Sequence, residues 1–368
     1  MIPTVLTDEA PRRVLVLGAN GRLGRAATLA FAGSGWRVLA QARRAPQVGW
    51  PAHVQPLVLP FDTADHAQAV LEAARRAGGA DTLVYALNPS RYTRAAWRAQ
   101  ALPMLRRAMA VAQGLNARFV MPGNVYAYGS TMPEVLHEDT PVCPDTEMGH
   151  IRQAMEVELA AAARRRELSS VVLRAGNFFG AGQGSWLDLV MLTQLHRGRL
   201  VYPGPMDVPV AWAYLPDLAQ ALVAVAQAWG PRAGFDTLHF QGHTLSGRDW
   251  LAGLEAMTGR APLRASSLPW GLMRLAGVFK PEWAALAEGR YLWERPHRLC
   301  QQALERRIGR EPHTPFAQAL AQSLADLGWS APLACGRGAQ PRPQGVSVKV
   351  ALASTAPFTS RSTRCGPG

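Results

Sequence analysis

The stretch Val14-Leu-Val-Leu-Gly18-Ala-Asn-Gly21-Arg-Leu-Gly24-Arg, near the start of the chain, decides the expected fold. Four apolar residues typical of a buried strand lead into three glycines spaced three apart, and a helical pattern follows. Gly18 allows a tight turn, Gly21 lets the backbone approach a diphosphate, and Gly24 lets the helix pack close to the strand. The stretch therefore predicts a strand, a phosphate-binding turn and a helix.

The start of this helix would offer free N–H groups and a positive dipole to phosphate oxygens. Glycines also occur in ordinary turns, but this triplet occupies the first strand-to-helix turn of an alternating α/β pattern. We therefore expect a dinucleotide to bind here. The expected cofactor-binding residues of the turn are Gly18, Asn20, Gly21, Arg22, Leu23 and Gly24.

From Arg13 onward, short aliphatic runs alternate with longer helical stretches. This alternation predicts an α/β fold with a Rossmann-type doubly wound parallel sheet. Pro103 is expected to kink or split the third helix. The expected strands are 14–17, 37–41, 54–59, 82–87, 118–121 and 170–174, and the expected helices between them are 22–32, 64–77, 92–113 and 149–166.

After Gly180 the regular alternation ends, which indicates a smaller, mainly helical C-terminal lobe. There we expect a helix at 186–196, a Pro/Gly-rich loop at 202–209, a helix at 216–229, a strand at 237–241 and mostly helices to 327. The end of the chain is rich in Gly, Pro, Ser, Thr and Arg without periodicity, as in disordered tails. The predicted domains are an NAD(P)-binding Rossmann domain at 12–180, a substrate-binding lobe at 181–330 and a disordered tail at 331–368.

The composition is that of a globular protein, with 48% hydrophobic and 18% charged residues among 368. Its net charge of +13 comes from 39 basic and 26 acidic residues, and the segment beyond Ala331 supplies +5 of it. The basic residues form no block of five or more like charges, so we expect no nucleic-acid partner.

The first residues carry Asp8 and Glu9 where a signal peptide would be basic and then apolar, and no apolar run is long enough to span a membrane. We therefore expect a cytoplasmic protein without a membrane partner. The four cysteines form no Cys-x-x-Cys pair, which argues against a metal site.

The choice of cofactor is expected to depend on the end of the second strand. An NAD site commonly has an acid there for the ribose 2′-hydroxyl, but residues 38–44 contain none. Arg43 and Arg44, with Arg22 as a further candidate, could instead bind a 2′-phosphate. This favours NADP over NAD. The alternative is that these arginines are ordinary exposed loop residues.

An ordered set of motifs resembles the extended short-chain dehydrogenase/reductase family, which contains nucleotide-sugar epimerases and dehydratases. Their order matches that of the family over about residues 12–258, and no later motif is decisive alone. The matching pieces are Gly18 to Gly24, Phe61-Asp62, Ala86-Leu-Asn88, Asn124-Val-Tyr-Ala-Tyr128-Gly129, Leu173-Arg-Ala-Gly-Asn177-Phe-Phe-Gly180 and Ala213-Tyr-Leu-Pro-Asp217-Leu-Ala.

The resemblance implies cofactor contacts beyond the glycine turn. Asp62 would lie near the adenine, the segment from Ala86 to Asn88 along the nicotinamide ribose, and Asn177 opposite the substrate. Each has a structural alternative: Asp62 could cap the helix expected to begin at residue 64, and the two asparagines could be turn residues.

The chemistry of this family normally rests on a Ser, a Tyr and a Lys four residues after the Tyr. Alignment through the motifs places Asn124 at the Ser position, Met148 at the Tyr position and Arg152 at the Lys position. The chain has no lysine before Lys280. Arg152 can bind a ribose and supply a fixed charge, and Asn124 can polarise a carbonyl, but Met148 cannot move a proton.

Among nearby side chains, Tyr126 is the best substitute acid, whereas Tyr128 is more typical of a core residue and His150 of a surface residue. We therefore expect an NAD(P)-binding oxidoreductase of the epimerase/dehydratase type, acting on a carbonyl or alcohol carbon of a small organic or sugar-like substrate. The alternative is an NADPH-binding sensor or partner protein that has lost the chemistry. A homodimer is compatible with either.

Overall fold

The computed structural model describes residues 12–329 except 47, 231–233, 260 and 278. Its centre is a seven-stranded parallel sheet, and the strand order reverses direction between β1 and β4. In doubly wound sheets this reversal creates a crevice at the carboxyl ends of the strands. In spatial order the strands are β11 (Phe235–His239), β7 (Ser170–Ala175), β5 (Arg118–Asn124), β4 (Thr82–Tyr85), β1 (Arg13–Leu17), β2 (Arg37–Ala42) and β3 (Val54–Val58).

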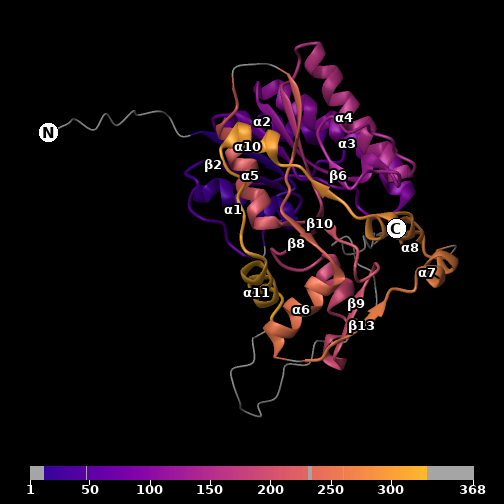
Figure 1. Ribbon diagram of the computed structural model, residues 1–368. Coiled ribbons are helices and arrows are strands. Elements are labelled where there is room, and N and C mark those ends of the chain that lie inside the picture. Colours follow the sequence, from indigo (N-terminus) through magenta and orange to yellow (C-terminus); the bar gives the residue numbers. More distant parts are fainter. Residues whose placement is uncertain (1–11, 47, 231–233, 260, 278, 330–368) are drawn as a thin grey trace, which may run out of the picture.

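Helices cover both faces of the sheet (Figure 1). Each face has its own core cluster, because parallel strands bury side chains on both sides. One face carries α1 (Arg22–Gly33), α5 (Leu215–Gln227) and α10 (Gln302–Ile308), and the other carries α2 (Ala64–Arg76), α3 (Arg94–Leu115) and α4 (Glu147–Arg164).

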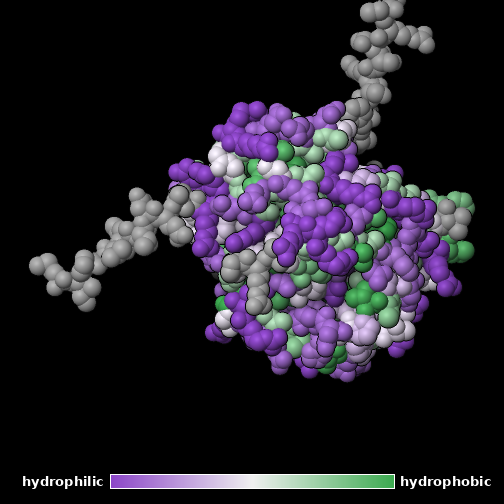
Figure 2. Space-filling view, turned by 90° about the horizontal axis from the view of Figure 1, so that it is seen from above, coloured by the Kyte–Doolittle hydropathy of each residue, from purple (hydrophilic) through white to green (hydrophobic). Residues whose placement is uncertain are grey.

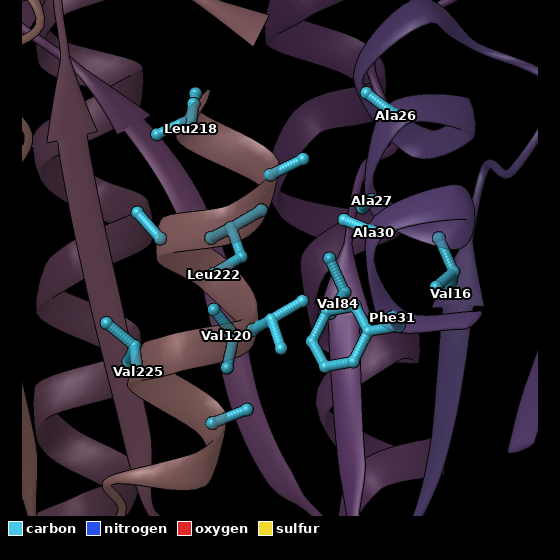
Figure 3. Close-up of a cluster of buried hydrophobic side chains, with 14 of the residues drawn as sticks. Val16, Ala26, Ala27, Ala30, Phe31, Val84, Val120, Leu218, Leu222 and Val225 are labelled. Atoms are coloured by element: carbon cyan, nitrogen blue, oxygen red, sulfur yellow. The ribbon is translucent and has the colours of Figure 1, made fainter. Parts of the chain in front are cut away.

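Figure 3 shows how α1 and α5 fill one face. The α1 surface is mostly alanine, so the two helices approach closely, and Phe31 supplies the bulk at its end. Leu222 of α5 packs with Val84 and Val120 from the sheet below. α5 and β11 both follow residue 180, yet they belong to the main sheet and its core. The division after residue 180 stays a prediction.

The rest of the chain forms a lobe with a separate aromatic core. Trp212 lies at its centre, with ring centroids 4.8 Å from Trp250 and 5.5 Å from Trp293. Its strands are β8 (Asn177–Phe179), β10 (Val210–Tyr214) and β12 (His243–Leu245) in one sheet, β9 (Arg199–Tyr202) with β13 (Arg264–Ser267), and β14 (Arg298–Leu299) with β6 (Val135–Leu136). Its helices are α6 (Gly247–Thr258), α7 (Trp270–Ala276), α8 (Pro281–Glu288), α9 (Tyr291–Glu294) and α11 (Phe316–Asp326).

The predicted fold class is confirmed, with corrections in detail. The helix expected at 186–196 is instead a π-helical turn, Leu187–Met191, followed by a 3-10 turn, Leu195–Arg197. Pro103 does not split α3. Proline has no N–H to donate to the carbonyl of Ala99, but Ala99 is exposed, so water can solvate that carbonyl. The expected disordered tail lies outside the described residues.

Candidate cofactor and active site

The three glycines between β1 and α1 differ in what surrounds them. Gly18 has φ +82°, and a Cβ there would lie 2.7 Å from the carbonyl oxygen of Ala86. A Cβ on Gly24 would lie 2.1 Å from the carbonyl oxygen of Gly18. A Cβ on Gly21 would meet only that same oxygen, at 3.3 Å. The fold therefore requires Gly18 and Gly24, whereas Gly21 leaves its outer side open.

The start of α1 has the properties of an anion site. Gly21 is its N-cap, no side chain accepts from the first N–H groups, and the first turn contains no acid. α4 is different: Thr146 accepts from Gly149 N at 3.1 Å and Glu288 accepts from Glu147 N at 2.6 Å. The uncapped α1 turn fits the diphosphate of a dinucleotide, because its N–H donors are not used by side chains.

Arg22 and Leu23 face in different directions. Leu23 packs against the core beneath α1, so it would contribute through its backbone N–H. Arg22 is partly buried, and burial lowers its pKa to about 10 although the nearby charge of Asp188 raises it. Its Nε has no hydrogen-bond partner. Its side chain lies beside the loop after β8, since a Cβ at Gly184 would be 3.7 Å from its Cδ.

The end of β2 supports the turn through Gln41, a residue outside the predicted set. Its Nε2 donates to Leu59 O at 2.7 Å, its Oε1 accepts from Gly18 N at 3.1 Å, and its backbone O accepts from Ala19 N at 2.8 Å. The signal in the sequence was a single polar residue inside a buried strand. Asn20 Nδ2 donates to Arg44 O at 2.8 Å, while the Arg43 and Arg44 side chains are exposed.

Asp62 follows β3 at the same end of the sheet. The N-cap of α2 is Thr63, which accepts from His66 N at 3.2 Å, so the alternative that Asp62 caps this helix is wrong. The exposed Asp62 carboxylate instead contacts His66 Nδ1 at 2.7 Å. A contact of Asp62 with adenine stays a prediction.

The structure brings the residues at the Tyr and Lys positions next to Tyr126. Arg152 donates to Asn88 Oδ1 at 3.3 Å, and its guanidinium stacks 4.9 Å from the Trp97 ring centroid. Burial lowers the pKa of Arg152, whereas the neighbouring Tyr85 and Tyr126 raise it. This guanidinium is thus a half-buried cation beside tyrosine side chains.

Tyr126 takes part in a cluster of tyrosines. Its hydroxyl lies 3.2 Å from that of Tyr92, and Tyr291 donates to its backbone oxygen at 3.3 Å. Asn124 Oδ1 accepts from Tyr126 N at 3.1 Å and so fixes the turn. Sequence reasoning missed Tyr92, because the contact joins residues 34 positions apart. Its one signal was an aromatic residue four positions after Asn88.

Met148 is buried and lines a cavity with Tyr92, Tyr126, Tyr291 and Leu292. The cavity holds about 10 Å³, which is room for about one water molecule. Met148 therefore lies against Tyr126 but brings no proton.

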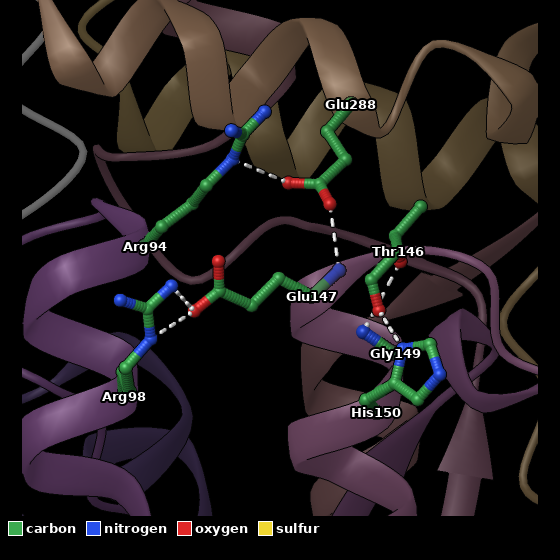
Figure 4. Close-up of polar contacts among 7 residues, drawn as sticks. All are labelled: Arg94, Arg98, Thr146, Glu147, Gly149, His150 and Glu288. Carbon is green, nitrogen blue, oxygen red and sulfur yellow. Dashed lines mark hydrogen bonds and ion pairs between the residues drawn. The ribbon is translucent and has the colours of Figure 1, made fainter.

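Figure 4 shows the polar contacts that join the lobe to this region. Glu288 of α8 accepts from Arg94 Nε at 3.0 Å as well as from the backbone of Glu147. The Glu147 carboxylate in turn accepts from Arg98 at 2.8 Å. These contacts fix the start of α4, which carries Met148 and Arg152, against α3 and α8. His150 is exposed, as expected.

A buried network lies one helical turn further along α4. Arg174 of β7 forms an ion pair with Glu156 and donates to the Tyr128 hydroxyl at 2.5 Å. Tyr128 is also 2.7 Å from His239 Nε2, and burial raises its pKa to about 12 although Arg174 lowers it. Tyr128 therefore stays protonated and acts as a core residue, as predicted.

Asn177 begins β8, next to Trp212 of β10, and is half-buried. A role for Asn177 opposite a substrate stays a prediction. Within the described ranges, no three or more His, Cys, Asp or Glu side chains come close enough to hold a metal ion. A search of the described helices also finds none with the length and apolarity needed to cross a membrane.

Comparison with known sequences gives two matches. A family model described as the NAD dependent epimerase/dehydratase family matches residues 14–233. A dTDP-6-deoxy-L-talose 4-dehydrogenase (NAD(P)(+)) of Kitasatospora kifunensis is 33% identical over 199 residues, which are 52% of this chain and 60% of the relative. The match thus spans less than two thirds of that relative.

Solved structures share the fold over nearly their full length. The UDP-glucose 4-epimerase of Thermotoga maritima, solved with UDP-glucose, is 14% identical with a TM-score of 0.66, covering 85% of this chain and 98% of its own. The enzyme WbmH of Bordetella bronchiseptica, solved with NAD⁺, is 16% identical with a TM-score of 0.66, covering 86% and 97%. Identities this low show a likeness of fold alone.

The family model extends from β1 through α5 and so includes the glycine turn, both strands next to the crevice and the residues of α4 aligned with the family's Tyr and Lys. It covers more than half of the chain. The expectation drawn from the ordered motifs is therefore confirmed: the chain belongs to the NAD-dependent epimerase/dehydratase family.

Proposed function

We propose that this chain binds a nicotinamide dinucleotide at the glycine turn and transfers hydride between it and the alcohol or carbonyl carbon of a small, sugar-like substrate. The observation that carries the proposal is the Tyr126 hydroxyl, 3.2 Å from that of Tyr92 and close enough to Arg152 for their charges to interact. This cluster follows β4 and β5, at the carboxyl ends where doubly wound sheets bind ligands.

The chain offers separate groups for each part of the cofactor. The free N–H groups of α1 would hold the diphosphate, and Arg152 with Asn88 would hold the nicotinamide ribose. When bound, the cofactor supplies the hydride donor or acceptor. We further propose NADP over NAD, because exposed Arg43 and Arg44 follow β2 and no acid lies within residues 38–44. Charge-assisted hydrogen bonds to a 2′-phosphate would favour NADP by about ten-fold or more.

Proton transfer is assigned to Tyr126. When an alcohol is oxidised, its carbon loses a hydride and its hydroxyl loses a proton that a base must accept; reduction reverses both transfers. The half-buried Arg152 cation, whose charge interacts with Tyr126, would stabilise the negative charge that develops on the Tyr126 oxygen during the transfer. Burial, with the Tyr126 hydroxyl beside it, raises the pKa of Tyr92 well above 10, so Tyr92 stays protonated and can donate to a Tyr126 oxygen that has lost its proton.

The relative from Kitasatospora kifunensis is named for a nucleotide-linked deoxysugar, and the Thermotoga maritima structure contains UDP-glucose. These printed names support a sugar-like substrate for this chain. The cavity beside Tyr126 has room for about one water molecule, so a sugar ring would enter it only if α8 and α9 moved away from Met148. The homodimer and the absence of a nucleic-acid partner remain predictions.

The test compares two tyrosine variants of the purified full chain. Tyr126→Phe removes the proposed acid and should lower kcat by about a hundred- to ten-thousand-fold without changing the cofactor Kd. Tyr202→Phe is the matched control, because the Tyr202 hydroxyl is buried without a partner. Reduction of sugar-like carbonyl compounds is followed by NADPH absorbance. Equal rates for Tyr126→Phe and the unmodified protein would exclude Tyr126 as the acid.

A second function is favoured by Met148 and the closed cavity: an NADPH-binding sensor or partner protein without turnover. It predicts tight NADPH binding and no oxidation of NADPH by any compound of the panel. The unmodified protein decides between the two functions, because turnover in it excludes the sensor.

A further inference from the structure

α7 has apolar side chains on two opposite faces. Trp270 and Met273 are buried on one face, where Trp270 Nε1 donates to Pro203 O at 2.6 Å. Leu272 and Leu275, three residues apart, are 60% and 72% exposed on the other face. A surface helix of a globular protein normally has one apolar face. The second face of α7 therefore lacks a covering partner.

The apolar surface continues beyond the helix. Phe279, four residues after Leu275, is 87% exposed. Leu272, Leu275 and Phe279 form what we call the α7 apolar patch. Of the seven large hydrophobic residues that are exposed in the described chain, these three lie within eight positions, whereas the other four are scattered over α1, α4 and the β2–β3 region. Clustering of this kind marks an interaction surface.

Basic side chains lie next to the α7 apolar patch in the sequence. Arg274 and Lys280 are both exposed, and the sequence has no acid from residue 268 to 281. The Lys280 ammonium lies 4.6 Å from the ring centroid of the half-buried Trp283. Trp beside Lys or Arg, next to exposed apolar side chains, is the combination found where proteins contact the interface of a bilayer.

The shape of the patch separates a membrane from a second protein copy. α7 lies at the margin of the molecule in Figure 1, and hydrophobic atoms protrude at the same margin in Figure 2. The three side chains expose on the order of 400 Å² in total, about half of what one partner buries in a stable dimer. A small, projecting apolar surface flanked by cations suits a lipid surface better than a flat protein interface.

We propose that the α7 apolar patch docks on a membrane surface that contains anionic lipids. Leu272, Leu275 and Phe279 would enter the boundary between headgroups and acyl chains, and Arg274 and Lys280 would face the headgroups. This departs from the expectation of no membrane partner, which rested on the lack of a spanning segment. The proposal does not depend on the proposed reaction.

Docking would bring the active-site cavity close to the membrane. α7 packs tightly on α8, since a Cβ at Gly277 would lie 3.0 Å from the Cβ of Ala284. The next residue, Ala285, lines the cavity that contains Tyr126, as does Glu288 one turn later. The wall of the cavity is therefore continuous with the docking helix.

The experiment is flotation of the full chain with vesicles of phosphatidylcholine alone and of phosphatidylcholine with phosphatidylglycerol. The unmodified protein should float with the anionic vesicles. The Leu275→Ser, Phe279→Ser double variant should bind these vesicles more weakly by a factor of about ten or more. Arg274→Gln and Lys280→Gln should each weaken binding about five-fold, on anionic vesicles only. Unchanged circular dichroism shows that each variant is folded.

Val157→Ser is the matched control, because Val157 is 56% exposed on α4, outside the patch. It should bind vesicles like the unmodified protein. Three results would overturn the proposal. The first is failure of the unmodified protein to float with anionic vesicles. The second is equal binding by the Leu275→Ser, Phe279→Ser variant, which would indicate attraction by net charge alone. The third is a dimer in sedimentation that this variant abolishes while vesicle binding is absent.

Discussion

At Gly21 a side chain would meet the ligand rather than the protein. The other two glycines of the turn have backbone atoms within 3 Å of the position that a Cβ would take, so substitution there would disturb the fold itself. Gly21 would place its Cβ 3.3 Å from one carbonyl oxygen and otherwise toward open space. It is therefore the residue at which cofactor binding can be changed separately from folding.

We predict that Gly21→Val abolishes dinucleotide binding and leaves the fold intact, because its side chain would occupy the space of the diphosphate. Binding is measured by titration with NADP and NAD, and folding by the urea midpoint. Gly33→Ala is the control, since a Cβ there meets nothing within 4 Å. A folded Gly21→Val protein with unchanged affinity would contradict the assignment of the turn.

Sequence reasoning reached the residues of the site that belong to contiguous motifs, such as Gly18 and Asn124. It did not reach Gln41 or Tyr92, whose roles depend on partners distant in the chain. Gln41 contacts Leu59 and the turn, and Tyr92 contacts Tyr126. Such pairs arise only when the strands come together in space, so no local pattern predicts them.

Among the elements, α8, with 8 residues, joins α3 and α4 beside the candidate site through the single side chain of Glu288. Its Glu288 side chain is 16% exposed and accepts from both Arg94 and the first N–H of α4. The carboxylate thus complements the positive end of the helix that carries Met148 and Arg152. Loss of this charge should loosen α8 from α4.

We predict that Glu288→Gln lowers the free energy of unfolding by about 1 kcal/mol, because it removes the charge that pairs with Arg94 and with the start of α4. The expected loss is modest, because Arg94 is half-exposed and solvent weakens the ion pair. Chemical denaturation measures this. Glu72→Gln is the control: it removes an exposed pair on α2, 3.9 Å long, and should change stability by less than about 0.5 kcal/mol. Equal effects of the two substitutions would contradict a special role of Glu288.

The elements of the sheet could be predicted because buried parallel strands are continuous apolar runs, as in β1 and β7. The lobe strands were missed for a physical reason. β8 and β12 have three residues each, too few for a periodic pattern, and their pairing with β10 is long-range. α3 was predicted to begin two residues too early, because Thr93 caps it by accepting from Ala96 N.

For the whole molecule, three buried histidines determine the response to acid. Burial lowers the pKa of His239, His243 and His297 from 6.5 to about 4. Below pH 6.5 the unfolded chain therefore binds protons that the folded chain does not, so the free energy of unfolding decreases as the pH is lowered. Glu311 acts in the opposite direction, because burial raises its pKa to about 7. The three histidines together have a larger effect on stability than Glu311, so the protein is less stable in acid.

We predict that the urea midpoint falls steeply between pH 6.5 and about 4, with each histidine contributing up to about 3 kcal/mol. His297→Gln should flatten this dependence by about half, because Glu311 offsets about one of the three histidines, whereas His53→Gln, at an exposed position, should not change it. A midpoint that is constant over this range in the unmodified protein would show that these histidines are protonated in the folded state.

The ion pair between Glu156 and Arg174 has a consequence for the history of this fold. Deleting one partner of such a pair costs about 3–5 kcal/mol, a large share of the stability of a domain. On the same helix, Met148 and Arg152 stand at the Tyr and Lys positions of the family and take no part in this ion pair. Selection on stability thus maintains the frame around an active site while the reacting groups drift, so an inherited frame is no record of an inherited reaction.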